Sequence, residues 1–327
     1  MSLDADTIVD RRRLRRKLTF WRVLAVLVAV IGIGAAAFRF AGPARLSEGR
    51  GGDYIARVKI EGLIRGDLER TESLERLAKS NAKAVVVQIN SPGGTTSGSE
   101  QLYESLRRIA EKKPVVAVVE GLAASGGYIA AMGSDYIVAQ GSSIVGSIGV
   151  LVQYPDVSDL LKTVGVKIEE VKSAPLKASP NGFEPTSPAA RAALESLVMD
   201  AFDWFKGMVR DRRRMDDAQL ALVSDGRVFT GRQAFELKLI DRVGNEDTAL
   251  AWLESEKSIK ATTPVRDWKL KPRFSDLTFI HLAALKSLEL LGLGELAQRV
   301  LSLGTVQAVE RLNLDGLLAL WHPPLSK

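Results

Sequence analysis

The sequence predicts an α/β fold built mainly from parallel strands. Between residues 54 and 151, short apolar runs rich in β-branched residues alternate with segments of helical periodicity. The runs 84–89 and 115–119 have the length and composition of buried strands, and a glycine-rich turn and a helical segment follow each of them. Parallel strands need a crossover between them, so this alternation is typical of α/β proteins.

The individual elements are expected in a simple order along the chain. Strands are predicted at 54–60, 84–89, 115–119, 136–139 and 144–151, and helices at 68–80, 98–112, 127–132 and 187–214. Residues 257–275 are polar and contain proline, which favours a linker. Residues 277–320 hold leucine-rich amphipathic stretches, which predict a helical C-terminal extension.

The N-terminal residues predict a membrane anchor. A basic cluster at 11–17 stands directly before an uncharged apolar run at 23–38. A helix needs roughly 20 such residues to cross a bilayer, and Arg22 and Arg39 can snorkel at its ends. The basic cluster would hold the N-terminus in the cytoplasm rather than bind nucleic acid. A cleaved signal peptide ending near residues 35–37 is the alternative, and it also sends the body of the protein out of the cytoplasm.

These features divide the chain into five expected parts. They are a basic cytoplasmic N-terminus (1–17), a transmembrane signal anchor (18–40), a linker (41–53), a folded α/β domain (54–255) and a helical C-terminal extension (256–327). The expected location is the inner membrane of a bacterium, with a single membrane pass and the α/β domain on the periplasmic side. Membrane lipid is therefore one expected partner, and no nucleic acid is expected.

Cysteine and histidine usage restricts the possible chemistry. The chain has no cysteine, which excludes disulfides, thiol nucleophiles and thiolate metal sites. It has two histidines, His281 and His322, and both lie far toward the C-terminus. A Ser-His-Asp triad in the central region is therefore excluded, and neither a metal nor a cofactor is expected.

Two glycine-rich turns carry the candidate chemistry. They are residues 90–94 (Asn-Ser-Pro-Gly-Gly) and 123–127 (Ala-Ala-Ser-Gly-Gly), and each lies between a predicted strand and a helix. Ser125 is the candidate nucleophile, because a serine at a strand-to-helix turn exposes its hydroxyl beside free amides. The Gly126 amide and the Gly94 amide would then form an oxyanion hole. The alternative reading is that both segments are simply tight turns.

A nucleophilic serine needs a base, and lysine is the substitute where histidine is absent. Lysine must be desolvated to act in this way, because a free lysine has a pKa near 10.4. The residues downstream of Ser125 offer four candidates, and their spacing does not choose between them. These candidates are Lys162, Lys167, Lys172 and Lys177.

Several motifs together resemble the S49 family of signal peptide peptidases, which are Ser-Lys proteases. Residues 90–94, 124–128 (Ala-Ser-Gly-Gly-Tyr) and 146–150 (Gly-Ser-Ile-Gly-Val) occur in the order that the family shows. A later segment, 225–234, followed by Leu-Ile-Asp at 239–241, is similar to the family as well.

The resemblance implies a role for each site residue. Ser125 would be the nucleophile, Lys177 the general base and Ser147 the residue that orients the lysine amine. It also implies a Clp/crotonase-like spiral of ββα units and a homo-oligomer. The implied substrates are membrane-associated peptides such as cleaved signal peptides, with small apolar side chains in the S1 pocket.

Two alternative functions stay open at this point. A crotonase-like enzyme would use the glycine amides to polarise an acyl thioester, without a nucleophilic serine. A non-catalytic membrane scaffold would keep the fold alone. Labelling by a serine-reactive probe separates the protease from the crotonase-like enzyme, and activity on a signal-peptide substrate separates it from the scaffold.

Overall fold

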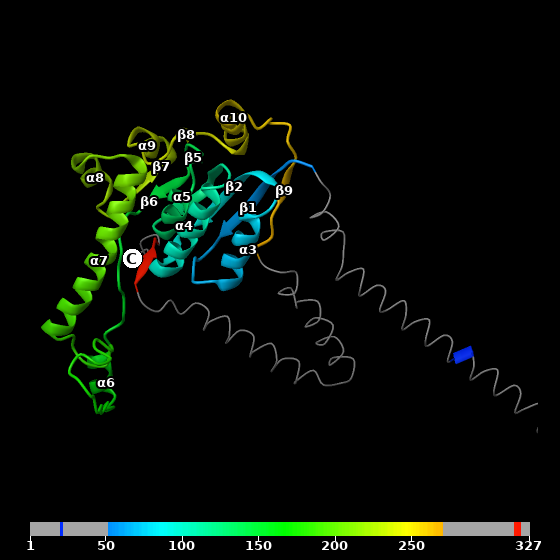
Figure 1. Cartoon of the computed structure of the whole chain (residues 1–327). Helices are drawn as coiled ribbons and strands as arrows, with labels where there is room; N and C mark the ends of the chain where they lie inside the picture. Colours follow the sequence, from blue (N-terminus) through cyan, green and yellow to red (C-terminus); the bar gives the residue numbers. More distant parts are fainter. Residues whose placement is uncertain (1–19, 22–51, 271–316, 322–327) are drawn as a thin grey trace, which may run out of the picture. The chain divides into compact units, whose positions relative to one another are not determined.

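The structure is a computed structural model that describes residues 20–21, 52–270 and 317–321 (Figure 1). The chain divides into two compact units, Met1–Gly52 and Asp53–Lys327. In the first unit the described residues Phe20 and Trp21 are helical. The rest of the expected anchor and residues 271–316 of the expected extension lie outside the described residues. Within the described part of the chain, no helix is both long enough and apolar enough to span a bilayer.

A mostly parallel sheet forms the centre of the second unit. Among the described residues it has eight strands, in the order β7-β6-β4-β2-β1-β9, with β5 pairing with β4 and β8 pairing with β5. The strands are β1 (Tyr54–Glu61), β2 (Ala82–Ser91), β4 (Val115–Ala124), β5 (Tyr136–Ala139), β6 (Ile144–Gly146), β7 (Val228–Thr230), β8 (Arg242–Val243) and β9 (Val265–Asp267). Every pairing is parallel except that of β6 with β7. The predicted α/β class is therefore confirmed.

Helices cover both faces of this sheet. Val85 and Val87 of β2 lie in one buried cluster with side chains of α3 (Leu68–Ala78), α4 (Thr96–Ala110) and α5 (Gly126–Met132). The alternate residues Ala84 and Val86 lie in a second cluster with side chains of α10 (Glu246–Lys257). Because both faces are buried, the strand reads as a continuous apolar run. The remaining helices are α6 (Ser158–Thr163), α7 (Pro188–Arg213), α8 (Asp217–Val223) and α9 (Gly231–Glu236).

Three expectations are corrected by the structure. The strand predicted at 144–151 ends at Gly146, because Gly146 and Ser147 have φ of 102° and 53° and leave the extended region. The expected linker 257–275 contains β9, which pairs with β1. The expected helical extension is a strand, β10 (Leu318–Leu320), at its described end. There the burial of Ala319 between two half-buried leucines follows a strand period, and pairing with β3 (Gly93–Thr95) outweighs helix propensity.

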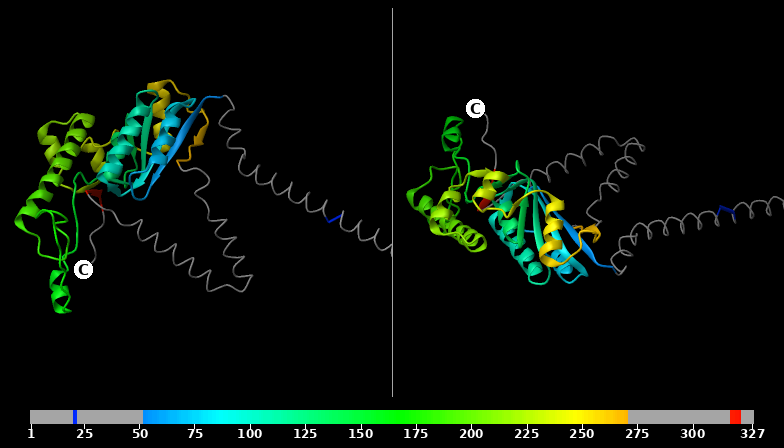
Figure 2. Two further views of the ribbon diagram at one scale, coloured as in Figure 1. Left: turned by 60° about the horizontal axis from the view of Figure 1, so that its bottom comes forward. Right: turned by 90° about the horizontal axis from the view of Figure 1, so that it is seen from above.

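An arm leaves the body of the second unit between β6 and α7. We use "the arm" for residues 152–186, which include α6. Figures 1 and 2 show that α6 and the first half of α7 extend away from the sheet. The second half of α7 packs on the core through Phe205, Met208 and Val209, whereas Leu197 in its first half is exposed. The arm is therefore exposed over most of its length.

Candidate active site

Ser125 lies where β4 ends and α5 begins, as the sequence predicts. Its backbone has φ 53° and ψ −114°, a conformation that non-glycine residues rarely adopt and that costs about 1–3 kcal/mol. Hydrogen bonds hold it there. The Ser125 amide donates to the Gly146 carbonyl at 2.7 Å, and the amides of Tyr128 and Ile129 donate to the Ser125 carbonyl at 2.9 Å. The strain lets the strand turn sharply into the helix and aims the serine side chain out of the turn.

The Ser125 hydroxyl is buried but weakly bonded. The residue is 1% exposed, and Oγ lies 3.4 Å from the Gly149 carbonyl oxygen, a long hydrogen bond. A hydroxyl with no strong partner is free to redirect its proton to a base. Gly149, which belongs to the motif at 146–150, thus takes part in the site although its role was not foreseen from the sequence.

Ser147 lies beside Ser125 because β6 pairs with the last residues of β4. Ala124 and Gly146 are partners in that register, so the residues that follow them, Ser125 and Ser147, are neighbours. Ser147 is buried and has φ 53°, and its amide donates to the Arg227 carbonyl at 2.8 Å. The structure therefore brings Ser125 and Ser147 together.

The Gly94 amide points to the edge of β3 that lies opposite Ile64. On one edge of β3, the Ile64 amide donates to the Gly93 carbonyl at 2.8 Å and the Thr95 amide donates to the Ile64 carbonyl at 2.9 Å. Backbone groups alternate between the two edges of a strand, so the polar groups of Gly94 point to the other edge. A side chain at Gly94 is impossible, because its Cβ would lie 1.8 Å from the Ile64 oxygen.

The two predicted oxyanion-hole residues border one small space. A Cβ added to Gly93 would lie 2.7 Å from the Gly126 nitrogen and 1.9 Å from the carbonyl oxygen of Ala319. Gly126 comes first in α5, where backbone amides have no partner within the helix. Three backbone groups thus border the space beside Ser125. They are the Gly126 amide, the edge of β3 at Gly94, and the Ala319 carbonyl between them.

The four candidate lysines lie on the arm, and two of them are engaged in ion pairs. Lys172 pairs with Glu170 and Glu184 at 2.5 and 2.9 Å, and hydrogen bonds to these two carboxylates raise its pKa above its usual value. Lys162 pairs with Asp159 at 2.9 Å. A lysine held in its charged form cannot accept a proton from serine.

Lys167 and Lys177 have no ion pair among the described residues. Lys177 is exposed on the arm, in a turn closed by a bond from its amide to the Ala174 carbonyl at 3.0 Å. Ser125 is buried in the body, so this chain alone does not bring Lys177 into contact with it. The structure therefore places Ser125 where the sequence predicts it. It does not place Lys177, the predicted base, next to Ser125.

Comparisons with known proteins decide the family. A model of peptidase family S49 matches residues 107–260, and a model of the Clp protease family matches residues 69–142. A candidate protease of Synechocystis is 35% identical over 200 residues, which cover 61% of this chain and 72% of that protein. The chain belongs to peptidase family S49. It is a serine protease, which sets aside the acyl-thioester and scaffold alternatives.

Two further relatives support the same family. A candidate signal peptide peptidase SppA of Enterococcus faecium is 30% identical over 235 residues, covering 67% of this chain and 68% of that one. Protease 4 of Haemophilus influenzae is 29% identical over 242 residues, and this chain spans 39% of its length. Among solved structures, ClpP1 of Listeria monocytogenes has a TM-score of 0.40 at 14% identity, covering 58% of this chain and 91% of that one.

The late motif, residues 225–234 and 239–241, supports the site through backbone pairing and hydrogen bonds. Its strand β7 pairs antiparallel with β6, and its Arg227 carbonyl accepts the Ser147 amide. At the other end of the motif, the Leu239 carbonyl accepts the hydroxyl of Tyr128 at 2.7 Å. Tyr128 is fully buried, and burial raises the pKa of its hydroxyl well above the usual range. The motif thus fixes both β6 and α5.

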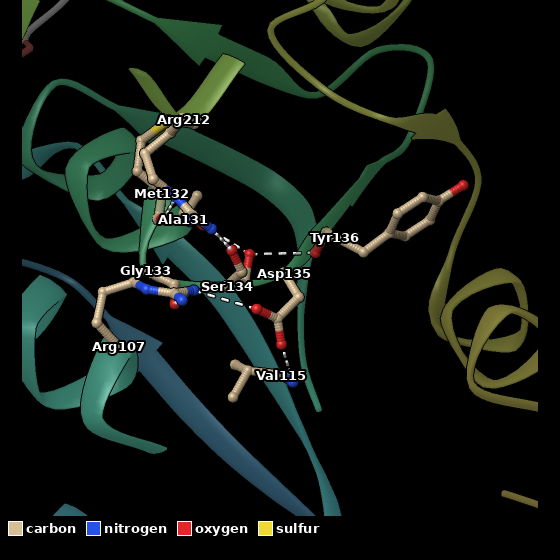
Figure 3. A network of polar contacts seen from close by, with 9 residues as sticks. All are labelled: Arg107, Val115, Ala131, Met132, Gly133, Ser134, Asp135, Tyr136 and Arg212. Carbon is tan, nitrogen blue, oxygen red and sulfur yellow. Dashed lines mark hydrogen bonds and ion pairs between the residues drawn. The ribbon is translucent and has the colours of Figure 1, made fainter. Parts of the chain in front are cut away.

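The C-terminal end of α5 is tied to its neighbours by two arginines (Figure 3). Arg212 of α7 donates to the Met132 carbonyl at 3.0 Å and to the Ser134 carbonyl at 2.6 Å. Arg107 of α4 forms an ion pair with Asp135 at 3.1 Å. Arg212 thus satisfies the carbonyl of Met132, the last residue of α5, and the two arginines hold the segment after α5 against α7 and α4.

Arg212→Met is expected to lower the free energy of unfolding by about 2–3 kcal/mol, because two hydrogen bonds from a charged donor are lost. Arg210 on the same helix is half exposed and lies 3.8 Å from its carboxylate partners, so Arg210→Met should cost about 0.5 kcal/mol or less. Urea denaturation of the two variants measures both values. Equal values for the two variants would show that the Arg212 bonds do not hold α5.

Proposed function

We propose that this S49 protease is a membrane-anchored endopeptidase that hydrolyses membrane-associated peptides, such as cleaved signal peptides, through a dyad of Ser125 and Lys177. The observation that carries the proposal is the strained backbone of Ser125 between β4 and α5. Ser125 lies beside the Gly126 amide and the edge of β3 to which the Gly94 amide points. Strain of this kind is retained where function requires it, and here it places a hydroxyl beside two amide donors.

The reaction would proceed through an acyl-enzyme. Ser125 Oγ attacks the peptide carbonyl carbon while its proton passes to the neutral amine of Lys177, which Ser147 orients. The amides of Gly94 and Gly126 stabilise the oxyanion, and one such donor contributes about 3 kcal/mol to the transition state. The C–N bond then breaks, and the leaving amine takes the proton from Lys177. Water, deprotonated by Lys177, hydrolyses the ester and restores Ser125.

The exposure of Lys177 supports a homo-oligomer in which the arm of one subunit reaches the site of the next. A solvated lysine is no base, so Lys177 needs a surface that buries it. The arm carries apolar side chains that lie open to solvent, and exposed apolar patches of this kind mark interaction sites. They are Leu160, Val164, Val166, Ile168, Val171, Leu176 and Phe183. A second copy of the chain would cover these apolar side chains and desolvate Lys177 at the same time.

The anchor and the substrate class rest on the sequence and on one relative. The basic cluster 11–17 and the apolar run 23–38 support a single-pass anchor with the protease body outside the cytoplasm. The relative from E. faecium carries the name of a signal peptide peptidase. Peptides left in the membrane after signal-peptide cleavage would reach an enzyme held at the same surface.

One experiment tests activity and orientation together. Intact spheroplasts that express the full chain should hydrolyse an added quenched fluorescent peptide derived from a signal peptide, and lysis should raise the rate little. Spheroplasts with Ser125→Ala serve as the control. Hydrolysis that appears only after lysis would reject the orientation of the anchor. No hydrolysis above the Ser125→Ala control, before or after lysis, would reject the proposed function.

A further inference from the structure

The strand β10 lies beside the turn that carries Ser125, because a Cβ added to Gly126 would be 2.9 Å from the Ala319 carbonyl oxygen. On one side it pairs antiparallel with β3, where the Thr96 amide donates to the Leu317 carbonyl at 3.0 Å and the Trp321 amide donates to the Pro92 carbonyl at 2.7 Å. On the other side, Leu318 and Leu151 exchange two amide-to-carbonyl bonds of 3.0 Å. The segment 317–321 is therefore hydrogen-bonded along both edges. Proteins that bind an extended peptide as an added β-strand hold it through the same kind of main-chain bonds.

The register sets Ala319 at the reactive position. Hydrogen-bonded pairs recur at every second residue of an antiparallel ladder, so the bonds at Thr96–Leu317 and Pro92–Trp321 make Gly94 and Ala319 the pair between them. The Ala319 carbonyl oxygen thus faces the Gly94 amide. It also lies against Gly126, since a Cβ added there would be 2.9 Å from it. This is the place where the carbonyl of a substrate would enter the oxyanion hole.

The side chains of the segment fit the same interpretation. Ala319 is 0% exposed and belongs to the main core cluster, so its side chain fills a small closed pocket. Leu317 lines a cavity of about 560 Å³ with Thr96 and Trp204, among other residues of α4 and α7. All five residues of the segment, Leu-Leu-Ala-Leu-Trp, are apolar.

We propose that residues 317–321 are an autoinhibitory strand that occupies the substrate cleft as a peptide substrate would, with Ala319 in the S1 position. The proposal rests on the proposed function of Ser125 and names the residue that its S1 pocket accepts. Because the strand belongs to the same chain, it competes with substrate at an effective concentration of order millimolar. Peptides that displace it would need a small residue at the same position and apolar neighbours.

The test is Ala319→Arg in the full chain, with hydrolysis of a quenched fluorescent peptide as the readout. Arginine does not fit the closed pocket, so the strand should leave, and the apparent KM should fall about tenfold with kcat changed little. Labelling of Ser125 by a fluorophosphonate probe should accelerate by a similar factor. Ala319→Gly should stay within about twofold of the unmodified chain, as should Leu325→Arg, which adds the same charge outside the strand.

A second variant guards against a folding defect in the first. A chain that ends at residue 316 should show the same fall in KM, and a synthetic peptide of residues 314–322 should inhibit it competitively. The same peptide with arginine at position 319 should not. If both variants are active and neither the KM nor the labelling rate changes, residues 317–321 are not an autoinhibitory strand, while the proposed function stands. If no variant and no unmodified chain reacts with peptide or probe, the proposed function fails and the inference falls with it.

Discussion

Ser125→Ala should lower kcat for peptide hydrolysis by about 10⁵-fold or more, because the attacking oxygen is lost and the oxyanion donors alone leave a small residual rate. Alanine keeps the positive φ of this position and loses only the long bond to Gly149, so stability should change little. Ser142 lies exposed before β6, and Ser142→Ala should leave kcat unchanged. Steady-state kinetics of the two purified variants measure the difference.

A glycine at the same position separates strain from chemistry. Ser125→Gly should be as inactive as the alanine variant, but it should raise the free energy of unfolding by about 1 kcal/mol, since glycine adopts φ 53° without cost. A glycine variant no more stable than the unmodified protein would show that the turn stores no strain. Activity that survives either substitution would show that another residue attacks the substrate.

Lys177→Met should have the second large effect, a fall in kcat of about 10⁴-fold, because a general base contributes up to this factor. Lys177→Arg should fail equally, since guanidinium stays charged. Lys167 is exposed on the same arm, so Lys167→Met is the matched control and should be nearly as active as the unmodified enzyme.

Mixing two inactive variants tests where the base comes from. If the arm of one subunit serves the next, equal amounts of Ser125→Ala and Lys177→Met chains should assemble with about one quarter of the sites complete. Activity should then return after the subunits exchange. No recovery would place both residues of the dyad in one chain. Loss of activity in Lys172→Met with full activity in Lys177→Met would assign the base to Lys172 instead.

The buried strands and the turn that carries Ser125 could be predicted from the sequence because their signals are local. The apolar runs of β2 and β4 are buried on both faces. The glycines that follow these runs lie so close to neighbouring atoms that a side chain would not fit there. Ser125 needs only the turn between β4 and α5, which lie next to each other in the chain. Period, length and turn chemistry were therefore sufficient for this part of the fold.

The features that escaped prediction depend on contacts between distant parts of the chain. Residues 318–320 sit in a leucine-rich region with helical spacing, yet they pair with β3, about two hundred residues earlier. The late motif reads as a family signature, but its role as a support for Ser147 and Tyr128 follows only from the pairing of β7 and the Leu239 carbonyl. The exposure of Lys177 depends on the course of the arm, which no local pattern encodes.

The identity of the nucleophile is tested most directly by mapping the adduct of a fluorophosphonate probe on the full-length protein by peptide mass spectrometry. The site geometry predicts a single adduct on Ser125, which Ser125→Ala removes and Lys177→Met slows strongly. An adduct on Ser147 or on any other residue, with Ser125 unmodified, would contradict the assignment of the active site.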